Sequence, residues 1–169
     1  TDIEVLRAHD AEYWDKLCQG TLSRQEERRT WFPWSPALVD REVMIMGGTV
    51  QCARYALEHG VALNVAGGTH HAFRDRGEGF CLLNDIALAA EALLEEGSIQ
   101  RALVMDLDVH QGNGTASMFA NDERVFTFSM HGAGNYPMHK ERSDLDIALP
   151  DGADDAAYLS ALGEQAHDG

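Results

Sequence analysis

A mostly apolar run that ends in acidic residues constrains the fold of this chain more than any other feature. Residues 101–107 (RALVMDL) form a near-continuous apolar segment, which is typical of a strand buried on both faces of a parallel sheet. The polar sequence DVHQGNG follows it directly. Residues 61–66 (VALNVA) and 124–130 (RVFTFSM) are two further predicted strands, and each also leads into a polar, glycine-containing loop.

Helical patterns separate these predicted strands. The spacing of apolar residues predicts helices over 2–19, 37–59, 84–96 and 155–166, and a shorter helix over 114–120. Gly60 is a C-cap candidate, and Asn84 or Asp85 is an N-cap candidate. The alternation of strands and helices predicts an α/β fold with a mainly parallel sheet, in which ligands bind at the carboxyl ends of the strands.

Residues 21–36 are predicted to be irregular. Pro33 and Pro36 exclude the interior of a helix in the aromatic segment WFPWSP, which covers residues 31–36. We interpret this segment as a packed aromatic corner, and the alternative is a contact with a ligand.

Composition limits the classes of partner. The 169 residues suffice for one domain, and the formal net charge of −15 argues against nucleic acid and against an anionic membrane surface. Cys18, Cys52 and Cys81 are widely spaced, so we expect no disulfide framework and a reducing, cytoplasmic location. No apolar run approaches the ~20 residues of a membrane span. Because the chain opens at Thr1 inside a helical pattern and stops at Gly169, we expect both ends to be cut from a longer protein.

Three residues after the central apolar run are spaced for a metal site. Asp106, Asp108 and His110 alternate, so they share one face of an extended chain. Two carboxylates and an imidazole that leave a buried strand need a counter-charge, and a divalent ion such as zinc supplies one. The alternative is an Asp that caps the next helix beside an unrelated His.

A pair of adjacent histidines follows the first predicted strand. His70 and His71 come after Gly67-Gly68, whose backbone freedom allows both rings to face one cavity. Alone, such a pair is most often a surface doublet. Beside the metal site, the same pair predicts two proton carriers that can be tuned near neutral pH.

The third segment of chemical interest covers residues 77–85 (GEGFCLLND). Gly79 and Phe80 predict the wall of a pocket, and the alternative is a loop that Phe80 anchors. Cys81 has no evident base beside it, so we interpret it as a small buried side chain.

Together these motifs resemble the histone deacetylase superfamily. The matching segments are AGGTHHA (66–72), GEGFCLLNDIA (77–87) and DLDVHQGNG (106–114), in this order and spacing. The sequence Gln111-Gly112-Asn113 is similar to class IV deacetylases and bacterial relatives. The resemblance continues weakly into residues 143–152 and implies an arginase-like, three-layer α/β/α fold that is incomplete here. Residues 1–169 would then be one partial catalytic domain.

The resemblance also implies a role for individual residues. Asp108 and His110 would be zinc ligands, and His71 would be the general base and then the general acid. Asn113 would orient His71 with less negative charge than the more common Asp, which would make His71 less basic. His70 would be an electrostatic partner oriented by Asp106. Further implied sites are a substrate tunnel (Gly79, Phe80, Tyr136), a structural potassium site (Asp106, Asp108, His110, Ser129, Met130) and a second alkali site formed by carbonyl oxygens of Phe119, Asp122 and Val125.

The implied activity is hydrolysis of an acyl-amide by water that zinc activates. Acyl-lysine proteins or peptides and acylated polyamines are the implied substrates, and an acidic enzyme can attract cationic substrates of this kind. The family's third zinc ligand, an Asp, and its oxyanion-stabilising Tyr have no counterpart here, because Asp151, Asp154, Asp155 and Asp168 stand in other contexts. We therefore expect weak zinc binding by this stretch alone. The alternatives are an inactive acyl-lysine-binding or partner-binding module and, less favoured without a second set of bridging carboxylates, an arginase-like hydrolase.

Overall fold

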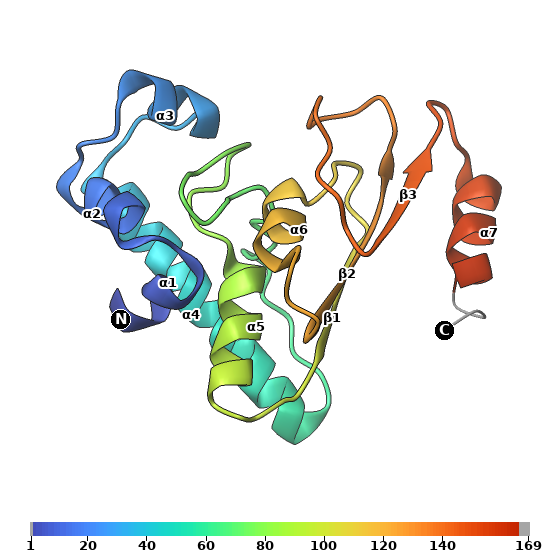
Figure 1. Ribbon diagram of the computed structural model, residues 1–169, viewed down its shortest axis with the longest axis horizontal. Helices are drawn as coiled ribbons and strands as arrows, with labels where there is room; N and C mark the ends of the chain where they lie inside the picture. The colour runs from blue at the N-terminus through green and yellow to red at the C-terminus, as the bar shows by residue number, and fades with distance from the viewer. Residues whose placement is uncertain (1, 166–169) are drawn as a thin grey trace.

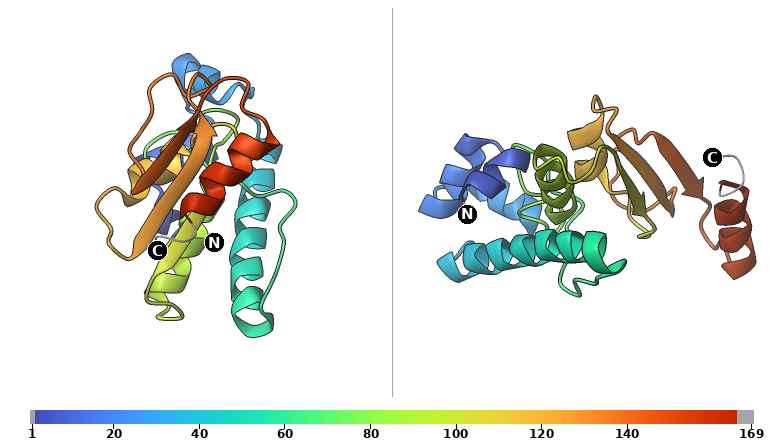
Figure 2. Two further views of the ribbon diagram at one scale, coloured as in Figure 1. Left: turned by 90° about the vertical axis from the view of Figure 1, so that its right-hand side faces the viewer. Right: turned by 90° about the horizontal axis from the view of Figure 1, so that it is seen from below.

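The computed structural model describes residues 2–165 and shows an α/β arrangement (Figure 1). Three parallel strands lie beside helices that come mostly from the first half of the chain. α7 lies beyond β3, on the side of the sheet remote from α1 to α3 (Figures 1 and 2). In chain order the elements are α1 (Asp2–Ala8), α2 (Ala11–Gln19), α3 (Arg24–Thr30), α4 (Pro36–His59), α5 (Asp85–Glu95), β1 (Ala102–Asp106), α6 (Asn113–Phe119), β2 (Val125–Gly132), β3 (Leu145–Leu149) and α7 (Asp155–Gln165).

The sheet has the order β1-β2-β3, and both pairs of strands are parallel. In this register Asp106 stands opposite Ser129, and Ser129 stands opposite Asp146. All three strands therefore end at the same edge, the upper edge in Figure 1. The predicted α/β class with a parallel sheet is confirmed, and the polar loops that follow the strands gather at this edge.

The hydrophobic core lies between the helices and one face of the sheet. Its large, fully buried side chains include Leu17, Met46, Leu82, Leu83 and Leu88, and Val104 of β1 packs against this cluster. The other face of β1 is exposed: Leu103 and Met105 point away from the core, so this part of the chain lacks the second helical layer of a three-layer fold. The predicted burial of this strand on both faces is therefore wrong for the described residues.

Helix ends follow ordinary capping chemistry. The predicted helix over 37–59 is α4, in which Ser35 accepts a hydrogen bond from the Leu38 amide and Gly60 is the C-cap. The Asn84 side chain caps α5 by accepting from the Ala87 amide. The predicted helices over 114–120 and 155–166 are α6 and α7, although residue 166 lies outside the described residues.

The predicted helix over 2–19 is two helices instead of one. The chain breaks at His9 and Asp10, where the Asp10 amide donates to the carbonyl of Arg74 and the buried His9 ring accepts from the Asn84 amide. The His9 amide still donates to the carbonyl of Val5, so the helical hydrogen bonds stop at Asp10, whose amide bonds to Arg74 instead. Apolar periodicity alone does not detect such a break, because both halves keep the same buried face.

Residues 21–36 are irregular only in part. α3 occupies Arg24–Thr30 and begins with a capping box, in which Ser23 and Glu26 each accept from the other's backbone amide. The aromatic corner is non-helical over residues 31–35, and Pro36 stands at the first position of α4, where a proline is tolerated. Within it the indole of Trp34 donates to the carbonyl of Leu17, which confirms a packing role for this residue.

The strand prediction for residues 61–66 is wrong. These residues form no ladder with β1, β2 or β3, and Val61, Leu63 and Val65 are exposed, Val65 to 92%. The strand that the sequence analysis missed is β3, which pairs with the second half of β2. A short apolar run is compatible with a strand, but it becomes one only where a neighbouring backbone supplies hydrogen bonds.

Two smaller predictions concern the cysteines and membrane spans. Within the described residues, Cys18, Cys52 and Cys81 form no disulfide. Within residues 2–165, no helix combines the length and apolar character that crossing a bilayer requires.

The buried ring of His9 predicts a specific pH dependence of stability. Burial lowers the pKa of His9 from its ordinary 6.5 to about 4, so the folded state holds the ring neutral. Between these two values the unfolded chain binds a proton that the folded chain does not. The stabilisation is complete above about pH 6.5 and is lost as the pH falls to about 4, a loss of about 2–3 kcal/mol.

Urea unfolding at pH 7 and pH 4.5 measures this loss. His9→Gln should reduce the difference in unfolding free energy between the two pH values, whereas His59→Gln, at the exposed end of α4, should leave it unchanged. An unchanged difference in the His9 variant would contradict the assignment.

Candidate active site

The loop that carries the two histidines is held by a buried carboxylate. Asp85, the first residue of α5, accepts hydrogen bonds from the amides of Gly68 and Thr69, from the Thr69 hydroxyl at 2.8 Å and from the Thr49 hydroxyl at 2.6 Å. A side chain at Gly67 would place its Cβ 2.4 Å from the Asp85 carboxylate, so the backbone can approach only as glycine. Gly67 therefore allows the backbone of the histidine loop to approach the Asp85 carboxylate closely.

His70 is paired with the acidic residue at the end of β1. Its Nδ1 lies 2.5 Å from Oδ2 of Asp106, and both side chains are about nine-tenths buried. The other oxygen of Asp106 accepts from the amide of Asp108 at 3.0 Å. A Cβ at Gly112 would lie 2.2 Å from Asp106 Oδ2, so glycine is required there too. Asp106 thus orients both the histidine loop and the loop after β1.

His71 begins a second chain of hydrogen bonds. Its Nδ1 lies 2.7 Å from Oδ1 of Asn113, the first residue of α6. The amide nitrogen of Asn113 donates to Glu78 at 3.1 Å, and the same carboxylate oxygen accepts from the Tyr136 hydroxyl at 2.8 Å. Because Glu78 is an acceptor, Asn113 must present its oxygen to His71. The proton on His71 then sits on Nδ1, which leaves Nε2 with a free lone pair.

Electrostatics keep His71 neutral. Burial and, to a smaller extent, the neighbouring His70 lower the pKa of His71 to about 4, although the hydrogen bond to Asn113 opposes both effects. Burial also raises the pKa of Tyr136, as does its hydrogen bond to Glu78. At neutral pH the site therefore presents a neutral imidazole that can accept a proton, beside a protonated phenol.

Asp108 and His110 lie at the open side of the cluster. Their side chains are 51% and 43% exposed, and Oδ1 of Asp108 is 3.1 Å from Nδ1 of His110, close enough for both atoms to bind one ion. The His110 ring centroid lies 6.0 Å from that of His71. Residues 2–165 nevertheless contain no group of three His, Cys, Asp or Glu side chains that converge as metal ligands. The two residues present therefore fit part of a zinc site.

Aromatic side chains form a wall above the histidine pair. The rings of His71 and Tyr136 are edge-to-face with centroids 5.0 Å apart, and Gly79 leaves the space between them open, because a Cβ there would contact both. Phe80 has a positive φ of 64° and packs edge-on against Trp31, 4.6 Å between centroids. Trp31 is 61% exposed, so the aromatic corner contributes to this wall as well as to packing.

The residues predicted for a potassium site are only partly gathered. Ser129 stands opposite Asp106 in the sheet, and both Ser129 and Met130 are buried. The Ser129 hydroxyl lies 3.0 Å from Nδ1 of His131. Asp106 of β1 and Ser129 of β2 are thus neighbours in the sheet. The potassium site itself stays a prediction.

Two further residues of the motifs have structural roles. Gln111 is fully buried, donates to the carbonyl of Glu141 and to Asp146, and accepts from the Glu141 amide. It ties the loop after β1 to the segment before β3. Cys81 is buried, and burial raises the pKa of its thiol to about 12, which agrees with its interpretation as a small buried side chain.

Glu78 was not predicted as part of this site, and Trp31 was covered only by the alternative that the aromatic segment contacts a ligand. Glu78 stands inside the recognised segment GEGFCLLND, but nothing in the spacing indicates that it reaches Asn113, 35 residues later. The capping box at Ser23 was the available signal for α3, whose C-cap is Trp31.

Comparison with known proteins places this geometry in a family. The model of the histone deacetylase domain matches residues 1–168. An uncharacterized protein of Picosynechococcus is 51% identical over 160 residues, which are 95% of this chain and 53% of the relative. Histone deacetylase 2 of Arabidopsis thaliana is 32% identical over 171 residues, which are 96% of this chain and 44% of that protein. The chain thus spans about half the length of these relatives.

Solved structures agree with the sequence relatives. A histone deacetylase homologue from Aquifex aeolicus superposes with a TM-score of 0.82 at 29% identity, covering 98% of this chain and 50% of that one. A structure of such a homologue in complex with SAHA gives a TM-score of 0.83, with the same identity and coverage.

The anchoring role of Asp85 is testable by an isosteric substitution. Asp85→Asn would replace one carboxylate oxygen by an NH2 group. That group would face backbone amides and hydroxyls that donate hydrogen bonds to the carboxylate in the native protein. We expect the free energy of unfolding to fall by about 2–4 kcal/mol, because buried donors lose their acceptor. Asp40→Asn, on the exposed side of α4, should cost about 0.5 kcal/mol or less. Equal stability of the two variants in urea titrations would show that the loop does not depend on Asp85.

Proposed function

We propose, on the premise that the chain belongs to the histone deacetylase family, that this cluster is the active site of a metal-dependent deacylase. The reaction would be hydrolysis of the amide of an acyl-lysine or an acylated polyamine. The observation that carries the proposal is the pairing of His70 with Asp106 and of His71 with Asn113, beside Asp108 and His110. This arrangement provides two oriented imidazoles next to two metal-binding side chains.

Asp108 and His110 would hold the zinc ion. When bound, zinc supplies a Lewis acid that polarises the acyl carbonyl and lowers the pKa of water. The short distance between Asp108 Oδ1 and His110 Nδ1 supports this assignment. Because residues 2–165 offer no third converging ligand, a complete site needs a further donor. The family resemblance implies a carboxylate.

His71 would move the proton. Its Nε2 carries a lone pair because Nδ1–H is committed to Asn113. It would accept a proton from the attacking water and deliver it to the amine that leaves. His70, held by Asp106, would stabilise the charge that develops beside it. A neutral His71 at neutral pH, which its lowered pKa ensures, is the required starting state.

Glu78 would supply the negative charge that Asn113 lacks. The side-chain amide of Asn113 is hydrogen-bonded to both His71 and Glu78. The Glu78 carboxylate therefore lies one hydrogen bond further from the His71 ring than Asn113 does. An imidazolium formed on His71 would thus still have an anion in its hydrogen-bond chain. Glu78 is a positioning residue in this scheme, because its contacts are Asn113, Tyr136 and Arg76 and not the reacting atoms.

The aromatic wall would enclose the acyl-bearing side chain. Gly79 and Tyr136 border His71, the adjacent Phe80 packs on Trp31, and a homologue of the same fold binds SAHA. The Tyr136 hydroxyl is bound to Glu78, so Tyr136 would line the tunnel without stabilising the oxyanion. The register of Asp106 with Ser129 supports a potassium site at this point, to which main-chain oxygens of Asp108, His110 and Met130 would contribute.

Replacing His71 tests the central role in this scheme. In the complete, zinc-loaded protein, His71→Ala should lower kcat on an acetyl-lysine peptide by about 10²- to 10⁴-fold, because the general base and acid is lost. SAHA affinity, measured by calorimetry, should change far less. His59→Ala, at the exposed end of α4, is the matched control and should keep full turnover. A wild-type protein that binds the peptide with zinc present and hydrolyses none would instead identify a binding module.

A double-mutant cycle tests Glu78. Glu78→Gln should lower kcat about tenfold with little change in KM, because a neutral amide replaces the anion behind Asn113. Asn113→Asp alone should also lower kcat, since it sets a second carboxylate against Glu78, about 3 Å away. Combining the two substitutions should recover activity, because the introduced carboxylate would take over the charge beside His71 and the introduced amide would donate to that carboxylate.

The recovery distinguishes charge supply from a structural role. If Glu78 only held the fold, the combined variant would be at least as inactive as either single variant. Glu123→Gln, an exposed residue remote from the site, controls for loss of surface charge.

A further inference from the structure

Three arginines of α3 stand at the rim of the site without acidic partners. Among residues 2–165, the guanidinium groups of Arg24, Arg28 and Arg29 make no ion pair or hydrogen bond, and all three residues are exposed. Arg7, Arg54 and Arg124, by contrast, each pair with a Glu or Asp side chain. In a chain with a net charge of −15, an unpaired basic cluster beside the active site is unusual.

α3 is fixed against the wall of the proposed tunnel. The capping box at Ser23 holds its first turn, and the carbonyl of Arg29 accepts from the amide of Gly79 at 2.9 Å. Thr30 is buried against Gly77, where a Cβ would lie 2.7 Å from its methyl group. The arginines therefore keep a defined position relative to Phe80. Figure 1 shows α3 toward the same end of the molecule as the carboxyl ends of the strands.

Two hollows on this surface are lined by the arginines. One, of about 440 Å³, is lined by Gln25, Arg28, Arg29, Trp31, Glu78 and Tyr136. A second, of about 690 Å³, adjoins it and includes Arg24, Arg28 and Trp31. Arg28 and Trp31 line both hollows. Tyr136 in the first hollow also packs on His71, so this basic surface is continuous with the aromatic wall above the histidine pair.

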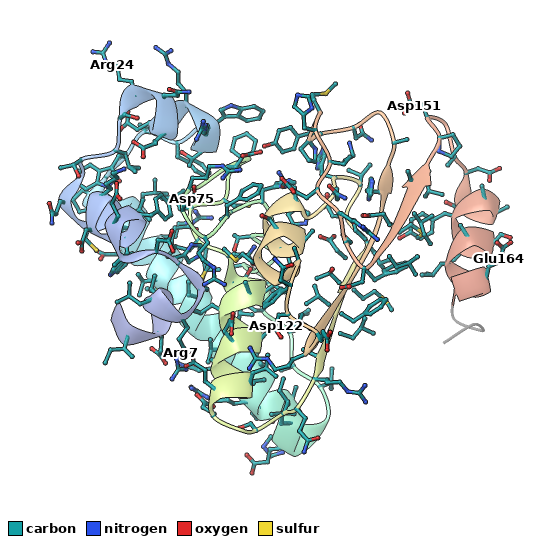
Figure 3. All side chains as sticks on the ribbon, in the orientation of Figure 1. Arg7, Arg24, Asp75, Asp122, Asp151 and Glu164 are labelled. Carbon is teal, nitrogen blue, oxygen red and sulfur yellow. The ribbon has the colours of Figure 1, made fainter. Side chains whose placement is uncertain are left out.

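The acidic side chains of α3 and of these two hollows do not cancel this charge. Glu78 already accepts two hydrogen bonds and lies 3.5 Å from the guanidinium of Arg76. Glu26 is paired with Lys16. Glu27, which lines the second hollow, is the one carboxylate left on α3, so the helix presents a net positive surface. Figure 3 shows the labelled Arg24 side chain projecting outward from α3.

We propose that the α3 arginines select the substrate by binding carboxylates that flank the acyl-lysine. This inference rests on the proposed deacylase function and narrows it to acyl-lysine in an acidic peptide segment. A polyamine or a lysine-rich tail brings further cations toward Arg28 and Arg29, and like charges at this rim disfavour binding. The exposed position of the arginines predicts a moderate effect that weakens with salt.

The test compares three peptides with the complete, zinc-loaded protein. Each peptide carries one acetyl-lysine, with two flanking residues on each side that are all Glu, all Gln or all Lys. Affinity is measured by fluorescence anisotropy and turnover by release of acetate. The Glu peptide should bind about three- to tenfold more tightly than the Gln peptide, and the Lys peptide more weakly still. Raising the salt from about 50 to about 500 mM should remove most of the difference.

Substitution then assigns the preference to α3. The pair Arg28→Gln and Arg29→Gln should abolish the preference for the Glu peptide and leave affinity and turnover of the Gln peptide unchanged. Arg101→Gln, an exposed arginine before β1 at the opposite end of the sheet, is the matched control and should keep the full preference. Acetylspermidine, a polycationic substrate, should be hydrolysed more efficiently by the double variant than by the wild type.

The outcomes separate this inference from the function on which it rests. Equal affinity of the wild type for all three peptides, or a preference that survives the double substitution, would overturn the role of the arginines. Hydrolysis of the Gln peptide in the same assay would still support the deacylase. Selective binding of the Glu peptide without hydrolysis of any peptide would overturn the deacylase instead.

Discussion

The carboxylate of Asp106 is the interaction on which the rest of the site depends. One oxygen is bound to His70 and the other accepts from the amide of Asp108, so a single side chain at the end of β1 orients two loops. It is positioned by the parallel register of β1 and β2 and by the missing side chain of Gly112. Loss of this carboxylate would release the histidine pair and the residues proposed to bind zinc at once.

The first residues of α5 and α6 provide a second constraint on the loops of the site. Asp85 holds the glycine loop before His70, and Asn113 holds the ring of His71. Each contact joins a loop to the first residue of a helix, where backbone geometry is well defined. The chemistry we propose therefore needs little rearrangement: a neutral His71 already faces the aromatic wall, and Asp108 and His110 already lie beside each other.

Much of this arrangement can be predicted from the sequence because it depends on local patterns. Apolar runs and caps identify α4, α5, β1 and β2, and the polar residues after the strands mark the site. The predictions from sequence fail where contacts between residues distant in the chain determine the structure. The first helix breaks where the Asp10 amide donates to the carbonyl of Arg74. Residues 61–66 find no strand to pair with, and β3 forms because β2 offers an edge. Glu78 was missed for the same reason, since its role depends on Asn113 and Tyr136 and not on its neighbours in the chain.

The central claim is that Asp108 and His110 bind the metal while His70 and His71 stay free to carry protons. Anomalous diffraction at the zinc edge, from crystals of the complete protein grown with zinc, tests this most directly. The account predicts one strong peak bonded to the Asp108 carboxylate and to Nδ1 of His110, with His70 still bound to Asp106. A peak bonded to either member of the histidine pair, or one elsewhere in the molecule with Asp108 and His110 unliganded, would contradict it.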